Sequence, residues 1–516
     1  MRWVRMRTAV MCGALLAGVT GCGLVSSGER DEGPITVGTI DTVTALDPAG
    51  AYDAASWALY GNVYQSLLTF TPGTSTPVAD AASRCEFHGG DLRTYVCELR
   101  EGLRFTSGRE MTARDVKFSF DRISRINSPQ GPGQLLETLR SVEAAGRTVT
   151  FHLRVPDATF PFKIATGAGS IVDSTRYPAD RLREGDAVDG SGPYELKSYQ
   201  AGTRAELKPN GDYRGGIKRK GEAVTVRYFR DAAAMAQAWK RRSIDVAGRQ
   251  LPPSVIAQQS PSDSGVKMME SAGATTRSLI FNLRDGSPVK DVAVRRAVAA
   301  VVDRVALARD IHLRTVEPLY SLIPQGLSGH TTSFFDAYPE PDPDRARALL
   351  RQAGILQPVR FRLAYSQGAA TDEEAALLKR QLEATGLFEV TTQHVPWKEF
   401  LEGYARGAYD AYCVTWVADF PDADTFTTPL VGKGSALHSG YVSARVEQRI
   451  AATQKSYERN RVAADFRAIQ KIVAEDVPLV PLWQKKEYTL SSSSISGTQY
   501  LTDGTGIWRL WQLGRI

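Results

Sequence analysis

Several signatures of catalysis and of membrane passage are missing from this sequence of 516 residues. Beyond the N-terminal segment no run reaches 18 apolar residues, so no transmembrane helix is expected there. The patterns G-x-S-x-G, H-E-x-x-H, G-x-x-x-x-G-K-[ST] and G-x-G-x-x-G do not occur, and no two of the six histidines have helical ligand spacing. Catalytic triads do assemble from distant residues. The absences nevertheless favour binding over catalysis, and we expect no enzymatic activity, no cofactor and no metal site.

A strong excess of one charge is also missing. The chain has 63 Lys and Arg against 57 Asp and Glu, a formal net charge of +6. Three of these positive charges, Arg2, Arg5 and Arg7, lie at the extreme N-terminus, and subtracting them leaves +3. Nucleic-acid binding usually requires a concentrated basic face. We therefore expect no nucleic-acid partner.

The N-terminus has the features of an export signal. Its arginines precede an apolar stretch, Thr8 to Val19, which has the length of a signal-peptide core and is too short to span a bilayer. The following Val19-Thr20-Gly21-Cys22 resembles a bacterial lipobox. We predict a lipoprotein signal peptide over residues 1–21, lipidation of Cys22 and a flexible tether over 22–33, which place the protein outside the cytoplasm on the outer face of the cell membrane. A secretory signal with a chance cysteine is the alternative.

Cysteine is scarce, with five residues in the chain. Once the signal is removed and Cys22 carries lipid, Cys85, Cys97 and Cys413 remain. Cys85 and Cys97 flank a turn signal at 89–91 and would face each other across a hairpin, so an oxidising compartment favours a disulfide there. Two reduced buried thiols are the alternative. Cys413 lies in an apolar strand and is more typical of core packing than of a nucleophile.

Strand and helix patterns alternate along most of the chain, which indicates an α/β architecture. A capping box at Thr371 and Glu374 is expected to open one helix. Asp342 and Pro343 open another, which ends at Gly354, and apolar stripes over 294–305 and 462–473 indicate two more. The expected strands are Ile35–Ile40, Thr148–Val155, Val224–Tyr228, Leu279–Leu283, Phe361–Tyr365 and Ala411–Trp416.

An ordered set of short motifs covers nearly the whole chain after the N-terminal segment. It resembles the extracellular solute-binding proteins of family 5, the dipeptide- and oligopeptide-binding components of ABC importers. Each motif alone is weak, whereas the colinear set is specific. The motifs are Leu46-Asp47-Pro48, Asn62 to Leu67, Thr94 to Phe105, Met111 to Phe118, Gly190 to Tyr194, Ser243 to Val246, Phe281-Asn282, Val294 to Ala297, Trp416 to Asp422 and Glu475 to Pro478.

This resemblance implies the type II (cluster C) periplasmic-binding-protein fold, with two hinged lobes and an extra subdomain inserted in the first lobe. Lobe II is expected over 271–487, and the inserted subdomain over 61–189. Lobe I takes the remaining segments, 34–60, 190–270 and 488–516. Contacts that a ligand makes to both lobes exist only in the closed state and would shift the population towards it.

The resemblance also singles out two candidate ligand-binding residues. In peptide-binding relatives an aspartate at the position of Asp419 receives the ligand's α-ammonium group, and the position of Trp416 lines the pocket. A carboxylate enclosed by closing lobes is costly unless a cation pairs with it. Alternatively, Asp419 caps a turn and Trp416 belongs to the core. Asp422 and Asp424 are expected to be solvated turn residues.

Six aromatic residues are further candidates for the pocket, although each alone is more typical of a core position. They are Trp57, Tyr60, Tyr64, Trp397, Tyr404 and Trp483.

The function implied is that of a monomeric, lipid-anchored receptor that captures short peptides and delivers them to the permease subunits of an ABC transporter. One alternative keeps the fold and changes the solute to a metal chelate, a glycoside or an amine. A second alternative, of another class, is an exported hydrolase.

Overall fold

The computed structural model describes residues 33–249, 251–259, 265–366, 368, 370–502, 504–505 and 507–516. The predicted signal peptide, the lipidation at Cys22 and the predicted tether up to residue 32 therefore lie outside the described residues. Within the described ranges, no helix combines the length and the apolar character that crossing a membrane requires.

A mixed sheet of eleven strands organises the protein. Its strand order is β15-β14-β16-β12-β17-β11-β1-β10-β9-β8, with β13 paired to β17. Neighbouring strands are parallel at two places, around β1 and around β14. The strands are β1 Ile35–Thr39, β8 Tyr194–Gln200, β9 Arg204–Pro209, β10 Val224–Tyr228, β11 Val246–Gly248, β12 Val266–Phe281, β13 Val316–Pro318, β14 Val359–Tyr365, β15 Phe388–His394, β16 Ala411–Val417 and β17 Leu479–Ser492.

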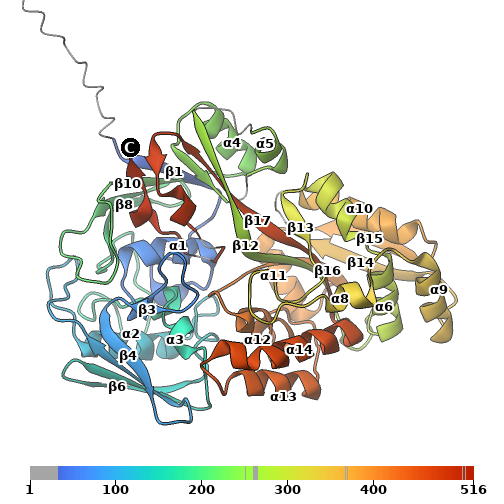
Figure 1. Cartoon of the computed structure of the whole chain (residues 1–516), viewed down its shortest axis with the longest axis horizontal. Coiled ribbons are helices and arrows are strands. Elements are labelled where there is room, and N and C mark those ends of the chain that lie inside the picture. Colours follow the sequence, from blue (N-terminus) through green and yellow to red (C-terminus); the bar gives the residue numbers. More distant parts are fainter. Residues whose placement is uncertain are drawn as a thin grey trace, which may run out of the picture. The chain divides into compact units, whose positions relative to one another are not determined.

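The two longest strands, β12 and β17, run antiparallel to each other through the middle of this sheet (Figure 1). The last nine residues of β12 are buried, whereas its first seven are partly or fully exposed. The register shifts between Ala272 and Thr276. Gly273 lies in this irregular stretch, and a Cβ there would come within 2.2 Å of the carbonyl oxygen of Lys485. The backbones thus approach too closely at this point for any residue but glycine.

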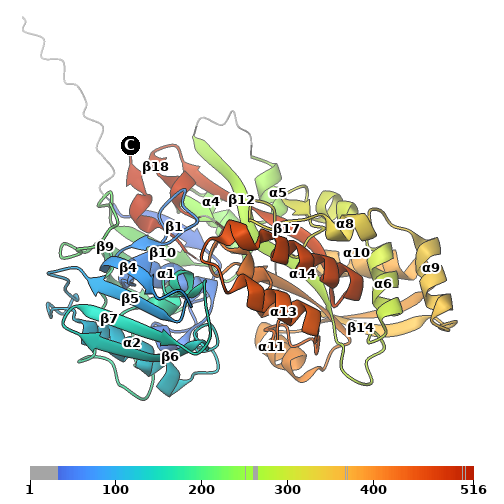
Figure 2. The same ribbon diagram turned by 60° about the horizontal axis from the view of Figure 1, so that its bottom comes forward.

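Apolar side chains gather in two large cores that β12 and β17 connect. The first core contains residues from 35–246 and 495–513, and the second core contains residues from 274–483. One residue, Phe420, departs from this division because its side chain belongs to the first core. A small third cluster, which includes Met235, Tyr488 and Leu490, covers the sheet around β11. Figure 2 shows β12 and β17 passing between the elements of the two large cores.

A separate antiparallel sheet, with the order β4-β5-β7-β6, contributes side chains to the first core. Helix α2 (Ala113–Ile126) packs against β6 and β7. Cys85 and Cys97 occupy opposite positions on β4 and β5 and form a disulfide, while Cys413 is free and buried. The strands are β4 Ala82–His88, β5 Thr94–Leu99, β6 Leu139–Ala145 and β7 Thr148–Leu153; two short pairs elsewhere are β2 Leu68–Thr69 with β3 Val78–Ala79, and β18 Ile495–Ser496 with β19 Gly514–Arg515.

We predict that replacing both Cys85 and Cys97 by alanine lowers the free energy of unfolding by about 3 kcal/mol, because the open chain regains the loop entropy that the bridge removes. Urea denaturation followed by circular dichroism measures the difference. A reductant should destabilise the wild-type protein by a similar amount and leave the double variant unchanged. Equal sensitivity of both proteins to the reductant would contradict the prediction.

Of the four helices that the sequence predicted, those at 342–354 and 462–473 begin and end within a few residues of α9 (Pro343–Gln352) and α14 (Ala463–Asp476). Asp342 caps α9 through a hydrogen bond from the Arg345 amide at 2.9 Å, and Gly354 follows the helix with a positive φ of 75°. The stripe expected over 294–305 is interrupted, because α6 ends at Val301 and Val305 is half exposed. The helices are α1 Ala54–Val63, α3 Phe160–Lys163, α4 Ala232–Lys240, α5 Pro253–Ala257, α6 Val292–Val301, α7 Arg304–Ala306, α8 Ser333–Ala337, α9 Pro343–Gln352, α10 Thr371–Glu383, α11 Trp397–Arg406, α12 Thr428–Val431, α13 Ala444–Thr453 and α14 Ala463–Asp476.

The predicted capping box at Thr371 and Glu374 is wrong. Thr371 is the first residue of α10, and its hydroxyl group bonds the carbonyl oxygen of Gly368. The Glu374 carboxylate turns into the second core, where it accepts hydrogen bonds from Arg277 at 2.8 Å and from the indole of Trp483 at 2.6 Å. It also lies 3.0 Å from His312. Although burial opposes it, the charge of Arg277 and these bonds lower the pKa of Glu374 to about 2.

Candidate functional site

The candidate site lies on the loop that follows β16. This strand pairs with β12, with Trp416 opposite Thr276. The next residue after the strand, Ala418, donates its backbone amide to the carbonyl oxygen of Ala274 at 3.0 Å and forms a parallel bridge with Thr505. The backbone is thus held on both sides immediately before Asp419. In open α/β sheets, residues just beyond the carboxyl ends of strands commonly bind ligands.

Asp419 is surrounded by hydroxyl groups rather than by cations. Its Oδ2 atom accepts a hydrogen bond from the Tyr52 hydroxyl at 2.8 Å and a longer one from the Thr425 hydroxyl at 3.2 Å. Its backbone amide donates to the same Thr425 oxygen at 3.0 Å. Within the part of the chain that the structure describes, no lysine or arginine pairs with this carboxylate. Lys163 acts on it only through its electric field, since its ammonium group bonds Asp157 at 2.8 Å.

Burial raises the pKa of the Asp419 carboxyl group to about 7, although the bonds from Tyr52 and Thr425 and the charge of Lys163 oppose the rise. The nearby Asp424 carboxylate adds to it. The residue as a whole is partly exposed, so its carboxyl group is desolvated without being sealed off. A carboxyl group in this state gains more from an arriving cation than a solvated one does.

Trp416 and Asp419 both form hydrogen bonds with Thr425. The indole nitrogen of Trp416 donates to the carbonyl oxygen of Thr425 at 2.8 Å, while the hydroxyl group of Thr425 contacts Asp419. The Trp416 ring is partly buried against the second core. The structure therefore brings the two predicted site residues together, with Trp416 near the end of β16 and Asp419 on the loop that follows. Trp416 fixes the turn of the loop that presents the carboxylate.

Asp422 and Asp424 are not the solvated turn residues that the sequence suggested. Asp422 is buried and receives two hydrogen bonds from the Arg459 guanidinium, at 2.8 and 3.0 Å. Asp424 is also buried and accepts hydrogen bonds from Thr428 at 2.8 Å and Gln454 at 2.7 Å. Burial raises the pKa of Asp424, which Lys163 opposes. The hydrogen bonds of Asp422 and Asp424 therefore fix the conformation of the loop that carries Asp419.

Contacts with the first core hold the other side of this loop. Phe420 inserts its ring into the first core, with its centroid 5.8 Å from that of Phe162. Further along the chain, the carbonyl oxygen of Gln454 accepts the amide of Ala158 at 3.2 Å, and the ring of Tyr457 lies 6.3 Å from that of Phe162. Asp419 thus lies where residues of the two cores meet.

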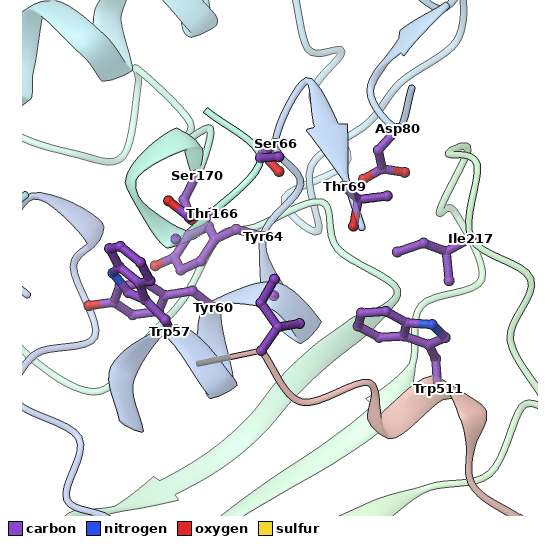
Figure 3. Close-up of a pocket in the computed structure, with 14 residues that line it drawn as sticks. Trp57, Tyr60, Tyr64, Ser66, Thr69, Asp80, Thr166, Ser170, Ile217 and Trp511 are labelled. Atoms are coloured by element: carbon purple, nitrogen blue, oxygen red, sulfur yellow. The ribbon is translucent and has the colours of Figure 1, made fainter. Parts of the chain in front are cut away.

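The six aromatic candidates divide into two groups. Trp57, Tyr60 and Tyr64 line a pocket in the first core, and their rings gather on one side of it while Trp511 and Ile217 lie on the other (Figure 3). Trp416 and Asp419 do not line this pocket. Outside it, Trp397 is about half exposed, Tyr404 stacks on Tyr412 at 5.2 Å and Trp483 bonds Glu374.

Sequence reasoning missed Tyr52 and Thr425. Thr425 lies six positions after Asp419, which is beyond the spacings of up to about four positions at which local side-chain hydrogen bonds have a sequence pattern. Tyr52 gave no signal either, since 367 positions separate it from Asp419.

Comparisons with known proteins agree with this architecture. The family model for bacterial extracellular solute-binding proteins, family 5, matches residues 76–437. The di/tripeptide-binding protein 2 of Pseudomonas aeruginosa strain UCBPP-PA14 is 26% identical over 482 residues, which cover 86% of this chain and 87% of that protein.

Two solved structures share the fold. The periplasmic binding protein DppA of Helicobacter pylori, in complex with the peptide STSA, has a TM-score of 0.81 at 20% identity and covers 94% of this chain and 98% of its own. The binding protein AgaA of A. tumefaciens R10, in complex with agropinic acid, has a TM-score of 0.81 at 18% identity and covers 94% and 99%. The fold is that of the type II periplasmic binding proteins of cluster C, as expected. The chain belongs to the bacterial extracellular solute-binding proteins of family 5.

Proposed function

We propose that this protein is the substrate-binding lipoprotein of an ABC importer, which captures short peptides outside the membrane and delivers them to the permease subunits. One observation carries the proposal: the Asp419 carboxyl group is desolvated where the two cores meet and has no cationic partner among the described residues. The peptide-binding relatives and the peptide complex of DppA support the choice of ligand.

The α-ammonium group of a peptide would supply the missing charge. Hydroxyl donors such as Tyr52 and Thr425 stabilise the carboxylate but bring no positive charge, whereas an ammonium group adds the Coulombic attraction of an opposite charge. A ligand without a cationic group would leave the charge of the Asp419 carboxylate without a positive partner, as in the empty protein. Asp419 would therefore select for a free amino terminus.

Closure of two lobes would complete the site. We assign lobe I to residues 34–60, 190–270 and 488–516, the inserted subdomain to 61–189 and lobe II to 271–487. The separation of the apolar side chains into two cores, joined by β12 and β17, supports this division. Contacts to both lobes would favour the closed state, which the permease would recognise. The protein would act as a monomer, held by lipid on Cys22 at the outer face of the cell membrane.

We predict that a panel of di- to pentapeptides with free amino termini binds in isothermal titration calorimetry, and that Asp419→Ala weakens this binding by about 2–5 kcal/mol, the usual loss when one partner of a desolvated charge pair is removed. N-acetylated peptides should bind weakly to both proteins. As a control, Asp344→Ala removes the carboxylate of an almost fully exposed aspartate on α9 and should change nothing.

Other outcomes of the same titration separate the alternatives. Equal losses for free and acetylated peptides in Asp419→Ala would remove the ammonium-binding role. The complex of AgaA with agropinic acid shows that this fold also holds a non-peptide solute. If no peptide binds while a metal chelate, a glycoside or an amine does, the protein is a receptor for that solute. Turnover of a peptide that a single substitution abolishes would instead establish a hydrolase.

A further inference from the structure

The side chain of Tyr52, which packs against the first core, bonds the Asp419 carboxylate. The Tyr52 hydroxyl donates to Oδ2 at 2.8 Å, whereas the second donor to this atom, Thr425, belongs to the loop of Asp419 itself. Tyr52 lies just before α1, and no other described residue outside the loop bonds this carboxylate. The bond therefore exists only while the two parts of the protein are together.

The position of Tyr52 is fixed by its own surroundings. Its ring packs on Trp57, with centroids 5.3 Å apart at an angle of 40°. The indole nitrogen of Trp57 in turn bonds the carbonyl oxygen of Ala51 at 3.3 Å. Behind Trp57 lies Gly167, where a Cβ would come within 2.3 Å of the indole ring. Since glycine allows this approach, the indole and the phenol ring are packed in place before any ligand arrives.

The hydrogen bonds divide the two carboxylate oxygens into separate roles. Both donors, Tyr52 and Thr425, bond Oδ2, and no described residue bonds Oδ1. Oδ1 is therefore the atom that remains for a ligand. A carboxylate that is held by one oxygen presents the other in a fixed direction, and such fixing reduces the entropy lost on binding.

We propose that Tyr52 is the residue that positions Asp419 for cationic ligands: by holding Oδ2 across the two lobes, as it does in this structure, it presents Oδ1 to the ligand's ammonium group. This inference rests on the proposed function, and it adds a residue of lobe I to a recognition site whose charge lies in lobe II. If Tyr52 served only to pack on Trp57, replacing it by phenylalanine would leave ligand binding unchanged.

The test compares Tyr52→Phe with the wild-type protein and with a matched control. Tyr52→Phe keeps the ring and removes the hydroxyl group. The control, Tyr365→Phe, also removes a tyrosine hydroxyl group that donates to an aspartate, Asp372, at 2.8 Å. Tyr365 and Asp372 both belong to lobe II, so this bond does not connect the two lobes. We expect Tyr52→Phe to weaken the binding of a dipeptide with a free amino terminus about tenfold or more, because hydrogen bonds to charged groups are among the stronger ones. Tyr365→Phe should bind like the wild type.

A second measurement needs no ligand. The Asp419 carboxyl group can be titrated in the empty protein by carbon NMR after selective aspartate labelling, with Asp419→Asn to assign its signal. The hydrogen bond from Tyr52 lowers the pKa of Asp419, so the pKa should rise in Tyr52→Phe and stay constant in Tyr365→Phe. The charged groups that also act on Asp419, Lys163 and Asp424, are unchanged in both variants.

The outcomes separate this inference from the proposed function. A higher pKa together with weaker binding in Tyr52→Phe supports the positioning role. An unchanged titration, or an unchanged affinity despite a shifted titration, overturns it while the receptor function stands. If the wild-type protein binds no ligand with an ammonium group, the proposed function fails and the positioning role fails with it.

Discussion

Asp47→Ala is expected to lower the free energy of unfolding by about 3–5 kcal/mol, the usual cost of removing one partner from a buried ion pair. Asp47 and Arg122 are both almost fully buried, and two hydrogen bonds of 2.6 and 2.5 Å join the carboxylate to the guanidinium. Asp47 also accepts the backbone amides of Ala49 at 3.0 Å and Arg183 at 2.7 Å. Among the described residues, alanine would leave the buried Arg122 guanidinium with carbonyl oxygens as its hydrogen-bond acceptors and no carboxylate to neutralise it.

Chemical denaturation with urea measures this loss, and an exposed pair provides the control. Arg360 and Glu389 form a similar two-bond contact, at 2.6 and 3.3 Å, between exposed side chains. Glu389→Ala should therefore cost no more than about 1 kcal/mol. Similar losses in the two variants would show that the burial of the Asp47 pair is energetically unimportant.

This ion pair gives a physical meaning to one of the family motifs. Leu46-Asp47-Pro48 was recognised only as a pattern, and its partner Arg122 lies 75 positions further along the chain. In the structure Asp47 caps the short turn at Pro48–Gly50 and anchors α2 through Arg122. The motif therefore connects the segment between β1 and α1 to helix α2.

Local patterns predicted many elements of the fold but not how the chain passes between its parts. The alternation at 148–155 predicted β7, and the stripe at 462–473 predicted α14, because each buries one face against one core. The prediction for 279–283 found only the end of β12. The beginning of that strand is partly exposed where it leaves the second core, so it lacks the apolar pattern by which the end was recognised.

The site residues were predicted where the family resemblance pointed to them and missed where distant contacts create the site. Asp419 and Trp416 were singled out by resemblance, and in the structure both form hydrogen bonds with Thr425, one from the end of β16 and the other from the loop that follows. Asp422 was misjudged because its partner, Arg459, lies 37 positions away. Glu374 was misjudged because three distant residues draw its side chain inwards. Tertiary contacts of this kind have no local signature in a single sequence.

Asp419→Asn is expected to stabilise the empty protein at neutral and alkaline pH. The folded pKa of about 7 lies above the value of 3.8 for a solvated aspartate. Between these values the folded state holds a proton that the unfolded chain has released, so the free energy of unfolding falls as pH rises. The loss reaches at most about 4 kcal/mol above pH 7. Asparagine carries no charge, and the variant should avoid this loss.

The measurement is the difference between variant and wild type in denaturation midpoint from pH 4 to pH 8. The difference should grow up to pH 7 and then level off. Because other groups titrate equally in both proteins, their contributions cancel. A difference that does not depend on pH would show that Asp419 ionises as a solvated carboxyl group, and the argument for a cation-seeking site would fail.

The proton that the Asp419 carboxyl group holds below pH 7 should be released into solution when the ligand binds. An ammonium group at Oδ1 favours the ionised carboxylate, so binding at pH 6 must release close to one proton, and binding at pH 8 almost none from this group. Calorimetry in two buffers of different ionisation enthalpy measures that number, which should be zero for any residual binding to Asp419→Asn. The affinity should rise with pH up to about 7 and fall once the ligand's own α-amino group, with a pKa of about 8, loses its proton. Desolvation of one carboxyl group would thus both destabilise the empty protein and strengthen its binding to a cation.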